Sequence, residues 1–374
     1  MKNYFKKAAV CAAAATLAVG SMTGCSKNVD GSKTVSTVND EEIKLGTVNL
    51  MLRYQQAQTA QMYEMYFGGS KGIWSQVADE ESGETYGEQT LADVMEQVED
   101  MVILRQHAAD YDVAVSDEEK DKIEKAAETF IEANEEETLT YLGVDQSMVE
   151  EVLELSYYKE KMHDPITADA DTNVSDDEAA QTGVTFVKVE DSEETQEDSE
   201  EEKADAKTRA QQILDEVMAT ADADMDAIAK GVDEDLSATT THFTTASTAE
   251  EENDTAVPQE VRDTVKDLTD GEVASKLVES DGAYYVVRLD AAFDKDATED
   301  EKQIIINDRQ QELYDETTQK WREDSKIDQN KKVLKTLKVT DNDKYSFKQA
   351  EEEETEDDAS VTTEEETVSD ESAE

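Results

Sequence analysis

Side chains that could act through sulfur or imidazole are few in this chain. Its 374 residues include two cysteines, Cys11 and Cys25, and three histidines, His107, His163 and His242. Cys11 lies in an N-terminal run that we expect to be removed, so the sequence predicts neither a disulfide nor a cysteine-based metal site. Three histidines far apart in the sequence provide few candidate ligands for a metal site and few candidate residues for a catalytic triad. The sequence therefore implies no metal and no cofactor.

Carboxylates, in contrast, are abundant. The chain has 94 Asp and Glu residues, and a pair of carboxylates is the machinery of acid–base chemistry such as glycoside hydrolysis. At this density pairs arise by chance, so we assign them to solvated faces. Asp191 to Glu202 and Ala350 to Glu374 are the most acidic runs. Neither run has the spacing or the glycine of a calcium loop. They predict a disordered loop and a disordered tail, the tail spanning 345–374. A tail that binds cations or a partner is the alternative.

The net charge limits the partners. It is −59, and removing residues 1–24 takes away three lysines and no acid. The remaining chain would repel nucleic acid and an anionic membrane surface. Nucleic acid is therefore excluded as a partner.

The first 25 residues have the layout of an export signal. Three lysines precede an Ala-rich apolar run from Ala8 to Val19, which is too short to span a bilayer. The run Met22-Thr23-Gly24-Cys25 resembles the lipobox of bacterial lipoprotein signal peptides, with Met22 where leucine is commonest. This resemblance implies a signal peptide of residues 1–24, lipidation of Cys25 and a tether of residues 25–34. The protein would then be lipid-anchored at the extracytoplasmic face of the cell membrane; an ordinary secretory signal is the alternative.

Helical patterns dominate residues 35–168. After a short strand-like piece at 35–43, apolar periodicity predicts helices over about 48–66, 90–109, 117–134 and 146–162. Thr90 with Asp93, and Ser116 with Glu119, have the spacing of capping boxes at helix starts. A further long helix is predicted over 298–335, with its own apolar face.

Residues 178–293 have a different character. An alternating strand at 183–189 is followed by two helices, a Thr-rich strand at 237–247, and a helix after Pro258. A hairpin around Asp281-Gly282 closes the region. The order β-α-α-β-α-β-β predicts a small α/β domain inserted into the helical part, and the whole chain an α+β fold.

Three stretches together resemble the PrsA/SurA family of extracytoplasmic foldases. The first runs from Gln89 to Glu119, a helix leading into the V-S-D-E-E capping box. The second is Val257-Pro258 with the helix and the L-T-D-G-E-V run that follow, and the third is S-D-G-A-Y-Y-V-V-R-L at 280–289. The last two resemble the end of a parvulin rotamase domain. The resemblance implies a helical module at 35–168, completed by the helix 298–335 packing on it, around a parvulin-like domain at 178–293.

The chain departs from the parvulin pattern where that family carries histidine. Parvulins have one in an H-I-L motif on the first strand, where this chain has Thr185-Phe186-Val187, and one in a G-Y-H motif, where Tyr285 stands. Their G-G-D-L-G turn is replaced by 238–244. Candidates to line a residual pocket are Phe186, His242, Phe243 and Tyr285, although Phe243 in the core and an exposed His242 are the plainer interpretation. No residue is predicted to be catalytic.

The resemblance implies a chaperone or foldase that binds unfolded or nascent secreted proteins. The candidates for client contact are Met62, Tyr63, Met65 and Tyr66, because methionine and aromatic side chains adapt to varied apolar partners; core packing of the same run is the alternative. An active peptidyl-prolyl isomerase with a rebuilt pocket is a rival hypothesis. A solute-binding lipoprotein is another, but the chain lacks the alternating strands and helices of two α/β lobes.

Overall fold

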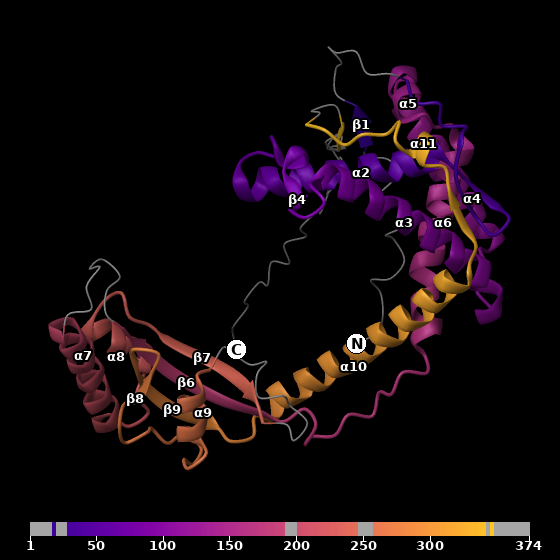
Figure 1. Ribbon diagram of the computed structural model, residues 1–374. Helices are drawn as coiled ribbons and strands as arrows, with labels where there is room; N and C mark the ends of the chain where they lie inside the picture. The colour runs from indigo at the N-terminus through magenta and orange to yellow at the C-terminus, as the bar shows by residue number, and fades with distance from the viewer. Residues whose placement is uncertain (1–16, 20–27, 191–199, 246–256, 342–344, 348–374) are drawn as a thin grey trace, which may run out of the picture. The chain divides into compact units, whose positions relative to one another are not determined.

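The chain divides into two compact units. Unit 1 comprises residues 1–162 and 321–374, and unit 2 comprises residues 163–320. The computed structural model (Figure 1) describes residues 17–19, 28–190, 200–245, 257–341 and 345–347. Cys25, the acids at 191–199 and the tail from 348 lie outside the described residues. No helix within the described ranges is both long enough and apolar enough to cross a membrane.

Unit 1 consists of helices and short strands. Its helices are α2 (Leu45–Phe67), α3 (Tyr86–His107), α4 (Asp117–Ala133), α5 (Glu136–Leu142), α6 (Gln146–Thr167, ending in unit 2) and α11 (Lys331–Leu334). Its strands are β2 (Thr34–Val38), β3 (Glu41–Lys44), β4 (Val77–Asp79), β5 (Glu84–Thr85), β10 (Ile327–Gln329) and the pair β1 (Leu17–Val19) and β11 (Tyr345–Phe347). β2 lies between β3 and β10 in an antiparallel sheet. The predicted strand-like piece before α2 is therefore a hairpin.

Capping chemistry decides where two of these helices begin. Ser116 and Glu119 form the predicted capping box of α4. The prediction for α3 is wrong: the box is formed by Thr85 and Glu88, so the helix begins at Tyr86. The hydroxyl of Thr90 instead donates to the carbonyl oxygen of Tyr86 over 2.8 Å. Thr85 lies six positions before Leu91, the first aliphatic residue of the helix, so the apolar periodicity alone does not reveal it.

Residues near the end of the chain pack along α2. Arg53 is only 6% exposed and donates from Nη2 to the carbonyl oxygen of Lys338 over 3.0 Å. Leu337 and Val339 are buried in the same apolar cluster as Leu52. Residues 337–339 therefore complete the core of unit 1.

Unit 2 contains a four-stranded antiparallel sheet in the order β7-β6-β9-β8. Its strands are β6 (Gln181–Val189), β7 (Ala238–Thr244), β8 (Val278–Ser280) and β9 (Ala283–Ala291), and its helices are α7 (Glu200–Ala219), α8 (Met225–Val232), α9 (Gln259–Val265) and most of α10 (Lys295–Asp324). The predicted α+β class is confirmed, and the elements occur in the predicted order β-α-α-β-α-β-β. At the turn between β8 and β9, Asp281 and Gly282 have φ values of 49° and 83°, as a tight hairpin requires.

Helices cover both faces of this sheet. Val187 and Val189 of β6 pack with α7 and α8 on one face, and Val184 and Phe186 pack with α9 on the other. β6 is therefore buried along nearly its whole length. This explains why it carries apolar residues on both faces of the sheet.

The long helix differs from its predicted bounds. α10 spans Lys295–Asp324, not 298–335, because the chain then enters strand β10, which pairs with β2. Asp294 caps it, because its Oδ1 accepts hydrogen bonds from the amides of Asp296 and Ala297 over 3.1 and 3.0 Å. Residues up to Lys320 belong to unit 2, and those from Trp321 belong to unit 1.

Candidate functional site

Three of the four pocket candidates lie together in the core of unit 2. Phe186 of β6, Phe243 of β7 and Tyr285 of β9 are 7%, 3% and 5% exposed and belong to one apolar cluster with Val261 and Val265 of α9. The rings of Phe186 and Tyr285 meet edge to face, with centroids 5.6 Å apart. Their side chains therefore fill the space between the sheet and α9. Burial also raises the pKa of Tyr285, so its phenol stays protonated at neutral pH.

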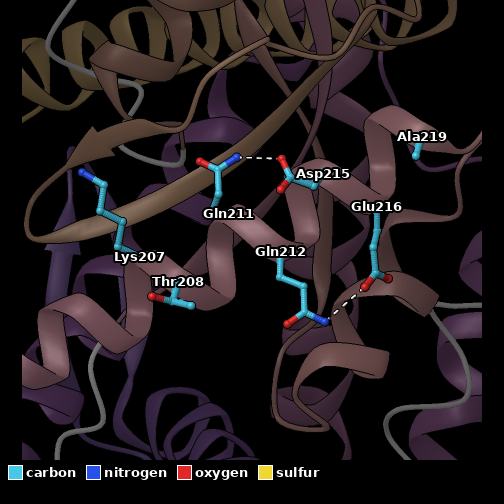
Figure 2. Close-up of a pocket in the computed structure, with 7 residues that line it drawn as sticks. All are labelled: Lys207, Thr208, Gln211, Gln212, Asp215, Glu216 and Ala219. Carbon is cyan, nitrogen blue, oxygen red and sulfur yellow. Dashed lines mark hydrogen bonds between the residues drawn. The ribbon is translucent and has the colours of Figure 1, made fainter.

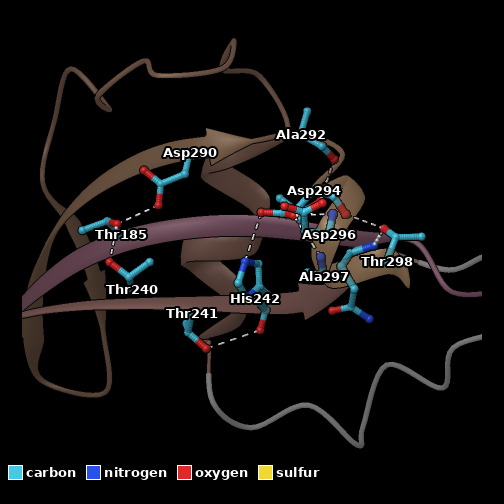
Figure 3. Close-up of polar contacts among 12 residues, drawn as sticks. Thr185, Thr240, Thr241, His242, Asp290, Ala292, Asp294, Asp296, Ala297 and Thr298 are labelled. Carbon is cyan, nitrogen blue, oxygen red and sulfur yellow. Dashed lines mark hydrogen bonds and ion pairs between the residues drawn. The ribbon is translucent and has the colours of Figure 1, made fainter. Parts of the chain in front are cut away.

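The fourth candidate, His242, lies on the opposite face of the sheet, and its side chain points toward Asp294 (Figure 3). It directly precedes Phe243 in β7, and successive side chains of a strand point to opposite faces. Its Nε2 lies 3.1 Å from Oδ2 of Asp294, the residue that caps α10. His242 thus does not line the same space as Phe186 and Tyr285.

Asp294 links β7 to the start of α10. Its pKa is lowered by the hydrogen bond from the amide of Ala297, and further by His242 and the amide of Asp296. Gly183 of β6 makes room for this arrangement: a Cβ there would lie 3.3 Å both from Oδ2 of Asp294 and from Cδ2 of His242. A side chain at residue 183 would therefore press on both partners of the contact between His242 and Asp294.

A cavity of about 390 Å³ surrounds this contact. It is lined by Gln181, His242, Asp294, Asp296, Ala297, Asp300, Glu301 and Ile304. Four of these are acids, which favours cations over anions. Nevertheless, no group of three or more His, Cys, Asp or Glu side chains among the described residues is placed to hold a metal ion.

A polar network that sequence reasoning missed lies near the middle of the sheet. Oγ1 of Thr185 lies 2.6 Å from Oδ2 of Asp290 and 2.8 Å from Oγ1 of Thr240 (Figure 3). Nε of Arg288 donates to Oδ1 of Asp290 over 2.6 Å. Thr185, which stands at the place of the parvulin H-I-L motif, is therefore engaged in a structural network. The alternation of Arg288 and Asp290 with apolar residues along β9 was the available sequence signal.

The client-contact candidates lie at the exposed end of α2. Met62, Met65 and Tyr66 are 47%, 71% and 73% exposed, and the neighbouring Phe67 is 74% exposed. Tyr63 differs, because it is half-buried against the core of unit 1, with its ring 5.2 Å from that of Phe67. The structure thus divides this run into one anchoring tyrosine and an apolar surface that faces solvent.

The exposed side of α7 forms a second depression, of about 830 Å³ (Figure 2). All its lining residues belong to that one helix: Lys207, Thr208, Gln211, Gln212, Asp215, Glu216 and Ala219. Gln211 and Gln212 hydrogen-bond to Asp215 and Glu216, one helical turn along, over 2.9 and 3.1 Å. These side chains satisfy one another, as on an ordinary solvated helix face.

Comparison with known proteins identifies the class of the domain in unit 2. Residues 186–291 match the rotamase family described as the PPIC-type PPIase domain. The predicted resemblance of residues 178–293 to a parvulin domain is thereby confirmed.

Solved foldase structures also resemble the chain. The foldase PrsA from Lactococcus lactis has a TM-score of 0.33 and 16% identity, over 81% of this chain and 97% of that one. PrsA from Bacillus subtilis has a TM-score of 0.24 and 14% identity, over 82% and 98%. For PrsA from Streptococcus pneumoniae the values are 0.26 and 15%, over 68% and 90%. No curated protein matches the chain.

Proposed function

We propose that this protein is a lipid-anchored foldase that binds unfolded secreted polypeptides at the extracytoplasmic face of the membrane. The PPIC-type domain supports a role in protein folding. The observation that carries the binding role is the exposure of Met65, Tyr66 and Phe67 at the end of α2, each more than 70% exposed. A group of large apolar side chains in solvent is typical of an interaction site, and methionine adapts to varied partners.

The proposed mechanism is reversible binding without efficient prolyl isomerisation. The strand positions where a parvulin carries histidine hold Thr185, Phe186 and Tyr285, none of which supplies an imidazole. The hydroxyl of Thr185 is already bonded to Asp290 and Thr240. The domain thus has the parvulin-like fold but lacks the histidine side chains that parvulins carry at these positions.

An aggregation assay tests the binding role. The purified mature protein should suppress aggregation of a denatured client at stoichiometric ratios, and the double variant Met65→Ser with Tyr66→Ser should lose most of this effect. Met218→Ser with Phe293→Ser is the matched control, because these side chains are 56% and 47% exposed elsewhere in the chain. Equal suppression by the wild type and both variants would exclude the end of α2 as the binding surface.

An active isomerase is the second candidate, favoured by the rotamase match itself. The test is the slow phase of a proline-limited refolding reaction, which takes on the order of tens to hundreds of seconds without a catalyst. We expect the protein to leave this phase nearly unchanged at catalytic concentrations. A large acceleration that Tyr285→Phe abolishes would establish the isomerase instead.

A further inference from the structure

We propose that the surface of residues 62–88 selects polypeptide segments in which apolar and aromatic residues are flanked by lysine or arginine. This inference rests on the proposed function, because it specifies the kind of client that the exposed end of α2 accepts. It goes further by assigning a role to the acidic side chains of the same segment.

Exposed apolar side chains are concentrated in this segment. Of the nine large hydrophobic residues that are exposed in the described part of the chain, six fall within it. They are Met62, Met65, Tyr66, Phe67, Val77 and Tyr86. They come from the end of α2, from strand β4 and from the first residue of α3, in the purple part of Figure 1. The segment thus combines flexible thioethers with aromatic rings.

The same segment is strongly acidic. Between residues 62 and 88 the sequence has six acids and one base, Lys71. The acids are Glu64, Asp79, Glu80, Glu81, Glu84 and Glu88, and all six are exposed. The apolar residues are therefore interspersed with carboxylates, and a bound segment would lie within reach of several negative charges.

Two of these acids have local structural roles. Asp79 accepts hydrogen bonds from the amide of Glu81 over 2.8 Å and from Oγ of Ser82 over 2.9 Å, which shapes the turn between β4 and β5. Glu88 belongs to the capping box of α3 with Thr85. In both cases these bonds lower the pKa of the carboxyl. Asp79 and Glu88 are therefore ionised and held in place.

The other four acids are free to pair with a ligand. The side chains of Glu64, Glu80, Glu81 and Glu84 make no hydrogen bond or ion pair with another residue in the described ranges. Nothing in the local turn or helix chemistry requires their charge. Unpaired carboxylates in the same segment as exposed apolar side chains are complementary to a ligand with positively charged flanks.

Charge also eliminates the other occupants. A second copy of this chain, with its net charge of −59, would bring further negative charge to the surface. An anionic lipid surface would be repelled for the same reason. Opposite charge speeds encounter and discriminates between partners more than it adds affinity, which suits a protein that must bind and release many chains.

A set of labelled peptides tests the proposal with the full mature protein. All share one apolar, aromatic centre, and their flanks are lysine, glutamine or glutamate. We expect the lysine-flanked peptide to bind the wild type at least about tenfold more tightly than the glutamate-flanked one at low salt, with the difference shrinking as salt screens the charges. Equal affinity for all three peptides would overturn the proposal.

Variants locate the effect. Glu80→Gln, Glu81→Gln and Glu84→Gln combined should weaken the lysine-flanked peptide by about fivefold and leave the glutamine-flanked peptide unchanged. The control variant removes the same number of negative charges from three acids of α4 that are also exposed. Its substitutions are Glu124→Gln, Glu128→Gln and Glu132→Gln. A control as weak in binding as the test variant would assign the preference to the net charge of the chain and contradict the proposal.

The same titrations separate this inference from the proposed function. If Met65→Ser with Tyr66→Ser abolishes binding of every peptide while the flanks make no difference, the end of α2 binds clients and only the preference for basic flanks is wrong. If that double variant binds all the peptides as the wild type does, the surface itself is wrong and both proposals fail.

Discussion

Arg322, in the last turn of α10, donates a hydrogen bond from Nη2 to Oε2 of Glu99 in α3 over 2.9 Å. The side chain of Glu99 is completely buried, and its other oxygen accepts from Ser36 and Gln329. Arg322 also pairs with Asp100 over 2.6 Å. One guanidinium thus joins the end of the long helix to α3, while Glu99 connects α3 to the neighbouring strands β2 and β10 of the small sheet.

Removing Arg322 should therefore destabilise unit 1. Loss of one partner leaves the other charge buried, which typically costs about 3–5 kcal/mol, so we expect Arg322→Met to lower the free energy of unfolding by this amount. Both tryptophans of the chain, Trp74 and Trp321, lie in unit 1, so tryptophan fluorescence during urea unfolding reports on this unit.

Lys320→Met is the matched control, because Lys320 is an exposed base of the same helix. It should shift the urea midpoint little. The double variant Glu99→Leu with Arg322→Leu should recover part of the loss, since apolar residues can replace a buried ion pair. An unchanged midpoint for Arg322→Met would show that the pair contributes nothing to unit 1.

Phe243 and His242 are neighbours in β7 but should respond very differently to substitution. Phe243→Ala should destabilise unit 2 by about 3–5 kcal/mol, because it leaves a cavity beneath α9. His242→Ala should cost far less, because 43% of its side chain is exposed. Hydrogen exchange of the backbone amides in β6 and β9 measures the stability of unit 2 separately from that of unit 1. Similar losses for both variants would contradict the placement of the two side chains.

The cap of α10 should make unit 2 sensitive to acid. The pKa of Asp294 in the folded protein lies below its ordinary value of 3.8, so its ionised form stabilises the fold at higher pH. This contribution is complete above the unfolded pKa and is lost as the pH falls through the folded one. Asp294→Asn retains an oxygen to cap the helix but removes the charge, so its stability should depend less on pH in this range.

Calorimetry between neutral pH and about pH 3 measures this difference. The wild type should be more stable than Asp294→Asn at neutral pH, and the two should converge in acid. Asp294→Ala, which also loses the cap, should be less stable than both by about 1 kcal/mol. A constant difference between the wild type and Asp294→Asn at every pH would refute a role for the carboxylate charge.

Cys25 should carry the membrane anchor. Replacing it with serine removes the sulfur that would be acylated, so Cys25→Ser should be released from the membrane fraction or accumulate as an uncleaved precursor. Fractionation of cells with detection of the chain in membrane and medium measures this. Retention and processing identical to the wild type would exclude lipidation at this residue.

The sequence by itself determined the elements and their order in unit 2. Alternating apolar residues predicted β6, and Asp281-Gly282 predicted the hairpin, because both signals come from residues adjacent in the chain. Ser116 and Glu119 predicted the start of α4 for the same reason. The parvulin-like character of the domain was also visible in the sequence, since its motifs are local.

Only the tertiary structure decided which side chains meet. Phe243 and His242 are adjacent in sequence, yet one enters the core beneath α9 and the other pairs with Asp294, because a strand alternates its faces. The 223 positions between Glu99 and Arg322 likewise hide their contact from any local pattern. Burial at such sites depends on how distant segments pack together, and packing is a property of the folded chain rather than of its neighbouring residues.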